Sequence, residues 1–304
     1  MRILFPKHPL ETTGVDPDFM NQHDAAHSAG FEISFVDYEA LTEGRAASAV
    51  KRVADGPAPA LLRGWMLKPH RYADLYQALQ AKGVTLVNTP EEYVFCHHLP
   101  RWYSAFADCT PKSLWVKGSP PDVQDCLQAV RKLGSHAAIV KDYVKSWKHD
   151  WLGACFIPDT SDQTNAERVI RKFIELQDSD LNEGVVLRAY ADLAKAGVHP
   201  ISGMPLSVEW RIFVLDKKPL VSIPYWPEAP ASIAPPVDFI NDCARRPLSR
   251  FFTVDLAQTS SGDWVVIELG DGQVAGLQDS SPSAFYGALA DVFRSASSPA
   301  GHVT

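Results

Sequence analysis

The segment FFTVDLAQTSSGDWVVIELGDGQ, residues 251–273, gives the strongest structural signal in this chain of 304 residues. Two apolar runs flank Ser261-Gly262, a pattern that predicts a hairpin of two strands. With the turn centred there, Asp255 lies directly opposite Glu268. Like charges at facing strand positions destabilise a sheet, so these two carboxylates need a compensating partner.

A divalent cation would be such a partner. Mg²⁺ binds proteins through one or two carboxylates together with substrate phosphates. Asp255 and Glu268 are therefore candidate magnesium ligands. The alternative interpretation is a hairpin whose acids face solvent and bind nothing.

The segment AAIVKDYVKSWKHDW, residues 137–151, contains three lysines, a residue type that binds phosphate as a point charge. Lys141 ends an apolar strand, where a charge must find a partner or leave the core. Lys145 and Lys148 follow in a loop, and for each of them a solvated basic loop is an equally good interpretation. Lys141 is the stronger candidate because of its strand position.

Two further strands carry charged residues among apolar ones. In SVEWRIFVL, residues 207–215, Glu209 and Arg211 share one face of the expected strand, because side chains alternate along it. A simple ion pair between them is the alternative to a functional role. In EGVVLRAY, residues 183–190, Arg188 stands near the end of a continuous apolar run.

The first third of the chain alternates short apolar runs with helical patterns, which predicts a parallel sheet covered by helices. We expect strands at residues 2–5, 32–36, 61–62 and 84–87, and a helix over 71–82.

The rest of the chain predicts a small α+β unit followed by a strand-rich part. In the small unit we expect strands at 114–116, 137–141 and 152–157, a helix that Pro120-Pro121 opens and Gly134 closes, and a second helix over 165–176. In the strand-rich part we expect strands at 184–189, 207–215, 219–223, 250–256 and 263–268, and a final helix from residue 282. The proline-rich segment 224–247 predicts a loop that shapes a substrate pocket.

Composition excludes several classes of protein. The formal net charge is -7 and no run of five basic residues occurs, so no nucleic-acid partner is expected. No apolar stretch approaches the ~20 residues that span a bilayer, and no signal peptide is expected. The five cysteines form no CxxC pair, which is typical of free thiols in a reducing compartment, so a cytoplasmic location is expected. Neither GxxxxGK[ST] nor a helix-opening GxGxxG is present.

In their order along the chain, the strand-borne lysine, the apolar strand with its arginine, the Glu-x-Arg strand and the Asp…Glu hairpin resemble the ATP-grasp superfamily. The details are most similar to the clade named R2K for one arginine and two lysines. The resemblance covers roughly residues 109–295. It implies an α/β and α+β chain: a Rossmann-like pre-ATP-grasp domain (1–108), a small ATP-grasp lobe (109–182) and a C-terminal lobe with the metal site (183–304).

The resemblance also implies roles for particular residues. Lys141 would contact the nucleotide phosphates, and Arg188 and Arg211 would face phosphate, acyl phosphate or an anionic substrate. Asp255 and Glu268 would hold magnesium. The nucleotide-binding set would comprise Lys141, Lys145, Val185, Val186, Leu187, Arg188, Ala189 and Glu209, with the hinge strand 185–189 binding adenine through its backbone.

Two departures from the family pattern are visible. Where many members have Glu-x-Asn, this chain has Gly270 in the third position, so Asp271 or Gln273 is expected to replace the missing metal ligand. The usual glycine-rich loop over the phosphates is absent. The segment KSWKHDW, residues 145–151, stands in its place, so Lys145 or Lys148 would act there by charge.

The activity that the resemblance implies is ligation of a carboxylate to an amine, with small-molecule or peptide substrates. ATP with Mg²⁺ would form an acyl phosphate that the amine then attacks. The alternatives are a phosphotransferase that acts on a hydroxyl group and a nucleotide-binding protein without catalysis. An oligomer is compatible with each of these readings.

Overall fold

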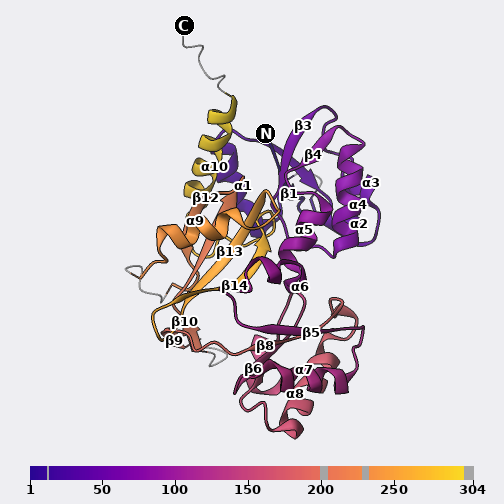
Figure 1. The fold of residues 1–304 in the computed structure, drawn as a ribbon. Helices are drawn as coiled ribbons and strands as arrows, with labels where there is room; N and C mark the ends of the chain where they lie inside the picture. Colours follow the sequence, from indigo (N-terminus) through magenta and orange to yellow (C-terminus); the bar gives the residue numbers. More distant parts are fainter. Residues whose placement is uncertain (12–13, 199–204, 228–232, 298–304) are drawn as a thin grey trace.

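The computed structural model describes residues 1–11, 14–198, 205–227 and 233–297. Its strands form three four-stranded sheets and one short hairpin. Figure 1 shows the N-terminal sheet and the C-terminal sheet side by side, with the small sheet below them.

The N-terminal unit is a parallel sheet in the order β2-β1-β3-β4, as the sequence predicted. Its strands are β1 (Arg2–Pro6), β2 (Glu32–Val36), β3 (Ala58–Leu62) and β4 (Val84–Leu86). Its helices are α1 (Met20–Ser28), α2 (Tyr38–Thr42), α3 (Ala46–Ala49), α4 (Pro69–Gln80), α5 (Pro90–His97) and α6 (Leu99–Trp102). Leu4 and Leu62 pack towards α4, whereas Ile3 and Phe5 face the core shared with the C-terminal helix.

The small sheet is antiparallel, in the order β5-β8-β6-β7, and α7 and α8 pack on it. Its elements are β5 (Ser113–Lys117), α7 (Val123–Leu133), β6 (Ala138–Asp142), β7 (Phe156–Ile157), α8 (Gln163–Gln177) and β8 (Gly184–Ala189). Asp122 caps the first turn of α7, and Gly134 ends that helix with a φ of 72° that favours glycine.

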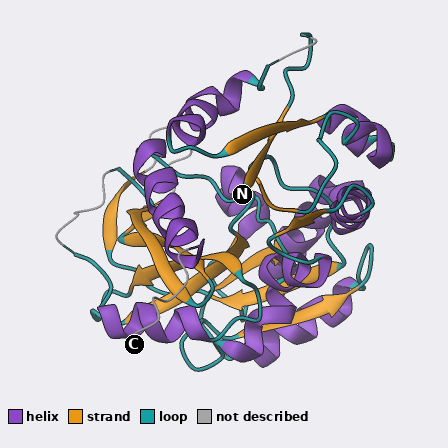
Figure 2. Ribbon diagram, turned by 90° about the horizontal axis from the view of Figure 1, so that it is seen from above, coloured by secondary structure: helices purple, strands orange, loops and turns teal. Residues whose placement is uncertain are grey.

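The C-terminal sheet is antiparallel, in the order β12-β11-β13-β14. Its elements are β11 (Glu209–Leu215), β12 (Lys218–Pro224), α9 (Val237–Arg245), β13 (Phe251–Gln258), β14 (Trp264–Asp271) and α10 (Pro282–Ser297). A separate hairpin of β9 (Lys195–Val198) and β10 (Pro205–Ser207) precedes them. Seen from above in Figure 2, helices lie around the outside of the strands.

Two local expectations were wrong. Residues 152–157 were expected to be a strand, but Trp151–Cys155 form a turn of π-helix and only Phe156–Ile157 are extended. Asp150 favours this turn because its side chain accepts a hydrogen bond from the backbone N–H of Gly153.

The proline-rich segment 224–247 was expected to be a loop, but α9 occupies much of its second half. Pro236 is the N-cap of this helix, and Ile240, Cys243 and Ala244 form its buried face. The spacing of these residues fits one side of a helix. Residues 228–232 of the segment lie outside the described part of the chain.

The pairing of β8 bears on the predicted division of the chain. β8 lies between β5 and β6, in the centre of the small sheet, although the division at 182/183 assigns it to the C-terminal lobe. We therefore propose that the small lobe extends through Ala189. The boundary at 108/109 stays a prediction.

Candidate active site

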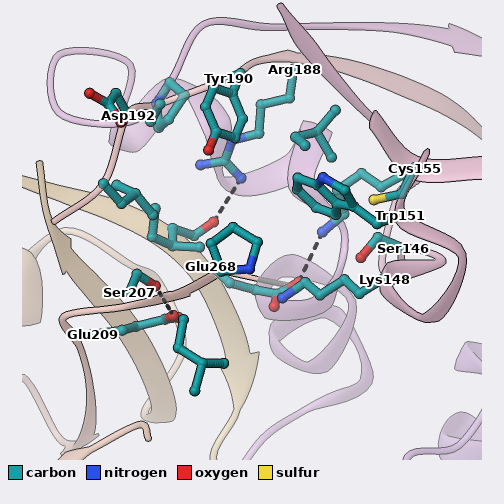
Figure 3. A pocket seen from close by; sticks show the side chains of 18 of the residues that line it. Ser146, Lys148, Trp151, Cys155, Arg188, Tyr190, Asp192, Ser207, Glu209 and Glu268 are labelled. Atoms are coloured by element: carbon teal, nitrogen blue, oxygen red, sulfur yellow. Dashed lines mark hydrogen bonds and ion pairs between the residues drawn. The ribbon is translucent and has the colours of Figure 1, made fainter. Parts of the chain in front are cut away.

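A cavity of 350 Å³ lies between the small sheet and the C-terminal sheet. That volume falls within the range of small-molecule sites, roughly 300–1,000 Å³. Residues of β6, β8, β14, the hairpin of β9 and β10, and the segment 146–155 line it. Figure 3 shows that the ends of β8 and β14 and the segment around Lys148 contribute side chains to one space.

A row of four charged side chains crosses the C-terminal sheet beside this cavity. Strand register places Arg211 opposite Asp255, and Asp255 opposite Glu268, which confirms the facing position expected for the two acids. Arg211 donates to both carboxylate oxygens of Asp255, at 2.9 and 2.8 Å. Lys141, from the small sheet, donates to Oε1 of Glu268 at 2.9 Å. The two carboxylates therefore lie between two cations, and the formal charge of the four side chains sums to zero.

The two carboxylates of this row respond differently to their surroundings. Burial favours the neutral form of Glu268, but Lys141 and Lys148 outweigh it and lower the pKa of this carboxyl to about 2. Burial raises the pKa of Asp255; Arg211 opposes this effect, and the neighbouring Glu268 adds to it. Glu268 is thus the more firmly ionised of the two acids.

Glu209 is a third carboxylate, and it lies in the cavity wall. Only 7% of the residue is exposed, and Ser207 donates its hydroxyl to Oε2 at 3.1 Å. Burial raises the pKa of Glu209 to about 7, although Lys148 lowers it. Its charge can therefore change near neutral pH.

Arg188 brings a positive charge into the cavity without a carboxylate partner in the described chain. Its guanidinium donates to the carbonyl oxygens of Ile267 at 2.7 Å and Val266 at 3.0 Å, and to the hydroxyl of Thr110 at 2.8 Å. Burial lowers the pKa of Arg188 to about 10, so the side chain is still cationic at neutral pH. Carbonyl partners fix its position but leave its charge available to an anion.

Residues 185–187 of the expected hinge strand do not line the cavity. Val185, Val186 and Leu187 are fully buried, and β8 pairs with β5 on one side and β6 on the other over these residues. Their backbone groups are therefore committed to the sheet. The strand reaches the cavity only from Arg188, and Ala189–Ala191 line it.

The loop lysines separate into one that reaches the cavity and one that does not. Lys148 lines the cavity, whereas Lys145 is exposed and lies outside its lining. Burial lowers the pKa of Lys148, but the carboxylates of Glu209 and Glu268 outweigh that effect and raise it overall. Of the two lysines expected to replace the glycine-rich loop, the geometry selects Lys148.

Asp271 does not join the candidate metal ligands. Its carboxylate is fully buried and accepts hydrogen bonds from Asn88 at 2.5 Å and from the Gln273 backbone at 2.9 Å. Gln273 belongs to the same buried network, since its side-chain amide donates to Tyr72. Asp271 lies three positions after Glu268 on the same strand. Because side chains alternate along a strand, this odd spacing makes the two side chains face opposite sides of the sheet.

The sequence analysis missed several residues that line the cavity. The hairpin of β9 and β10 contributes Lys195, Leu206 and Ser207. An aromatic wall also forms, in which Trp151 stacks on Phe156 at 5.1 Å and Tyr190 packs on Phe156 at 5.0 Å. The available signal was the position of Trp151 and Tyr190 as the last residues of the two charged segments 137–151 and 183–190.

Asp255 and Glu268 fit a magnesium ion that is held jointly with phosphates. Within the described ranges, no group of three or more histidine, cysteine or acidic side chains could hold a metal alone. Mg²⁺ needs only one or two carboxylates when substrate phosphates and water complete its shell. Lys141 donates to Oε1 of Glu268, so a cation and this carboxylate already meet at the edge of the cavity where the phosphates would lie.

An N-terminal parallel sheet, followed by two antiparallel sheets with a charged cavity between them, defines the architecture of ATP-grasp proteins. The family model "ATP-grasp domain, R2K clade family 3" matches residues 132–289, more than half of the chain. The chain therefore belongs to this family of ATP-grasp proteins, as the order of its motifs suggested.

Solved structures show the same fold over almost the full length. The ATP-grasp ligase PsnB, complexed with a minimal precursor, Mg and ADP, is 15% identical; 97% of each chain is covered, with a TM-score of 0.57. D-cycloserine synthetase DcsG is 15% identical over 96% of this chain and 98% of its own, with a TM-score of 0.56. The macrocyclase MdnC of Microcystis aeruginosa, bound with precursor peptide MdnA, is 11% identical over 97% and 100%, with a TM-score of 0.53.

Two further comparisons gave negative findings. No protein with a curated description matches this sequence. Across the described residues, none of the helices combines the length and the apolar character needed to cross a membrane.

Proposed function

We propose that the chain is an ATP- and Mg²⁺-dependent ligase that joins a carboxylate to an amine through an acyl phosphate. The observation that carries the proposal is the balanced row of Lys141, Glu268, Asp255 and Arg211 at the edge of a cavity that also receives Lys148 and Arg188. Fixed positive charges around a dry cleft stabilise the charge that develops on a transferred phosphoryl group.

The nucleotide is proposed to lie along the cavity. Its adenine would meet the segment Ala189–Ala191 and the aromatic wall near Trp151. Lys141 and Lys148 would bind the phosphates, and Glu209 would complete the nucleotide contacts. The four-charge row would then lie at the phosphate end.

Asp255 and Glu268 would hold magnesium at this end. With magnesium held there, part of the negative charge of the phosphates would be neutralised. Arg211 holds both oxygens of Asp255 and lies with its guanidinium 4.8 Å from the centre of the Tyr225 ring, so it fixes the orientation of this ligand. Arg188 would face the anionic group of the substrate, because no carboxylate of the described chain neutralises it.

The raised pKa of the cysteine in the cavity disfavours a covalent enzyme intermediate on its sulfur. Cys155 lines the cavity, but burial raises the pKa of its thiol to about 11. A thiol in this state is a poor nucleophile at neutral pH. An activated intermediate formed on the substrate itself meets this constraint. Because PsnB and MdnC were crystallised with precursor peptides, a peptide carboxylate is one proposed substrate and a small acid is the other.

Oxygen-18 transfer tests the reaction type. Amino acids and peptides are first screened in pairs for ADP release, and the acid of an active pair is then labelled with oxygen-18 in its carboxylate. We expect one labelled oxygen in the released phosphate, together with ADP and the ligated product. We also expect hydroxylamine to trap the intermediate as a hydroxamate when only the acid is supplied.

Other product patterns would contradict the proposal. Phosphorylated alcohol without ligated product would identify a phosphotransferase. AMP with pyrophosphate, or product with unlabelled phosphate, would show a different activation step. Binding of ATP with Mg²⁺ but no turnover across the whole screen would favour a nucleotide-binding protein without catalysis.

A further inference from the structure

Two of the five cysteines are in contact, far from each other in the sequence. All five are free thiols in the structure. Cys109 precedes β5 and is half-buried, whereas Cys243 lies on α9 and is fully buried. Cys109 packs against the apolar cluster that contains Cys243, and Arg246, which lies one turn after Cys243, reaches the Cys109 sulfur. The interaction between the two thiols lowers the pKa of Cys109 and raises that of Cys243.

The surroundings of Cys109 favour its thiolate form. Arg246 places Nη1 3.5 Å from the Cys109 sulfur. The interaction with Cys243 is the largest influence on Cys109 and lowers its pKa; burial opposes it, and the Arg246 charge supports it. Asp108 and Asp242 both pair with Arg246 and reduce the effect of its charge. Cys109 is thus the more reactive and the more accessible of the two sulfurs.

We propose that Cys109 and Cys243 form a reversible dithiol–disulfide pair. The Cys109 thiolate attacks a peroxide, takes one oxygen to become a sulfenic acid and, with a proton, releases the other as water. The Cys243 thiol then attacks this sulfur, so that a sulfur–sulfur bond forms and a second water leaves. The peroxide is reduced and two thiols are oxidised; a dithiol reductant reverses the reaction.

The bond would join two parts of the protein that meet beside the cavity. Val266 of β14 donates its backbone N–H to the carbonyl of Cys109, and the next residue, Thr110, contacts Arg188. Pro111 lines the cavity. The disulfide would therefore tie α9 to the segment that leads into the small sheet, and it would restrain a long stretch of the unfolded chain.

Peroxide treatment of the full-length protein tests the pair. After the remaining thiols are alkylated, non-reduced peptides are mapped by mass spectrometry. We expect the thiol count of the denatured protein to fall from the five cysteines to three, with one cross-linked peptide pair that contains Cys109 and Cys243. Dithiothreitol should restore all thiols, and the oxidised form should unfold at a higher temperature than the reduced form.

Variants separate this pair from general oxidation. Cys243→Ser should accumulate a sulfenic acid at Cys109 that dimedone labels, whereas Cys109→Ser should keep its remaining thiols at the same peroxide dose. Cys126→Ser is the matched control, since Cys126 is also buried on a helix, and it should still form the cross-link. A disulfide between other cysteines would overturn the proposal, as would a Cys109 that is oxidised in the wild type without a cross-link. Neither readout depends on ligase activity.

Discussion

Glu268 and Asp271 belong to the same strand, β14, yet their carboxylates meet opposite surroundings. Glu268 faces Lys141 across the cavity, and its pKa falls to about 2. Asp271 meets only amide groups beneath the N-terminal unit, and burial raises its pKa to about 7. Burial alone therefore does not decide the state of a carboxylate; the partners on its face of the sheet do.

The difference also separates the face of the sheet that meets the cavity from its docking face, which packs against the N-terminal unit. Asn88, which follows β4, donates to Asp271 and to the carbonyl of Phe251. Arg63, which follows β3, donates to the carbonyl of Gly272 at 2.7 Å. These contacts hold the N-terminal unit against the C-terminal sheet. Glu268 serves the cavity, whereas Asp271 joins two parts of the chain.

The largest expected effect follows from removing the cation that faces Glu268. Lys141→Ala should weaken binding of ATP with Mg²⁺ by about 10- to 100-fold, because a charge-assisted hydrogen bond contributes about 1.5–3 kcal/mol. Turnover should fall further, by about 100-fold or more. Isothermal titration calorimetry measures the affinity, and circular dichroism checks the fold.

Lys145→Ala is the control for this variant, because Lys145 lies outside the cavity. It should bind the nucleotide like the wild type. Unchanged affinity in a folded Lys141→Ala protein would remove Lys141 from the site. A variant that fails to fold would instead make the Lys141–Glu268 pair structural.

The second effect is a magnesium-dependent stabilisation that should depend on Glu268 but not on Asp271. ATP with Mg²⁺ should raise the unfolding temperature more than ATP with a chelator, because the tighter ligand stabilises the native state more. A ligand at a free concentration of about 100 times its Kd stabilises the native state by about 2.7 kcal/mol. This difference should vanish in Glu268→Gln and persist in Asp271→Asn. Thermal unfolding with and without chelator measures it. Equal loss in both variants would contradict the assignment of opposite faces.

The third effect is a pH dependence of the free energy of unfolding that arises from Asp271 on the docking face. The pKa of Asp271 is about 7 in the folded protein against 3.8 in the reference state. Between these values the folded protein binds more protons at this position than the unfolded chain, so the free energy of unfolding decreases as pH rises. Glu209 contributes in the same direction.

Asp271→Asn should reduce the decrease of the free energy of unfolding with rising pH. The contribution of Glu209 to this decrease should remain. Urea unfolding at a series of pH values between about 4 and 8 measures the free energy of unfolding in both proteins. The expected difference amounts to a few kcal/mol at most over the window. Parallel curves for wild type and variant would mean that Asp271 ionises as readily as an exposed acid.

The facing position of Asp255 and Glu268 was predicted from a turn centred on Ser261-Gly262. The register of the hairpin shifts between Asp255 and Leu256, and the sequence did not reveal this irregularity. β8 was predicted with the bounds that the structure shows, because its apolar run is uninterrupted. The opposite orientation of Asp271 was also readable, since an odd spacing along a strand changes the face. Family resemblance led instead to its assignment as a metal ligand.

Other features depend on contacts between distant segments and could not be read locally. The hairpin of β9 and β10 lines the cavity through contacts that its own short apolar pattern does not reveal. The prolines around α9 obscured its buried face at Ile240 and Cys243. The sequence shows that residues 185–187 form an apolar strand, but not that both edges of this strand are paired.

The smallest expected effect concerns Lys148 and Lys145. Like Glu268 and Asp271, they are close in sequence, but only one of the two lines the cavity. Lys148 adds positive charge near Glu268 and Glu209, whereas Lys145 faces solvent. Lys148 lines the cavity but, like Lys145, is open to solvent on its outer side, so its charge is partly screened. Lys148→Ala should therefore weaken binding of ATP with Mg²⁺ only a few-fold, about 1 kcal/mol or less. Raising the salt concentration should reduce the difference from wild type. Calorimetry at low and high salt, with Lys145→Ala as the matched control, measures both effects; a larger loss in Lys145→Ala than in Lys148→Ala would reverse the choice between them.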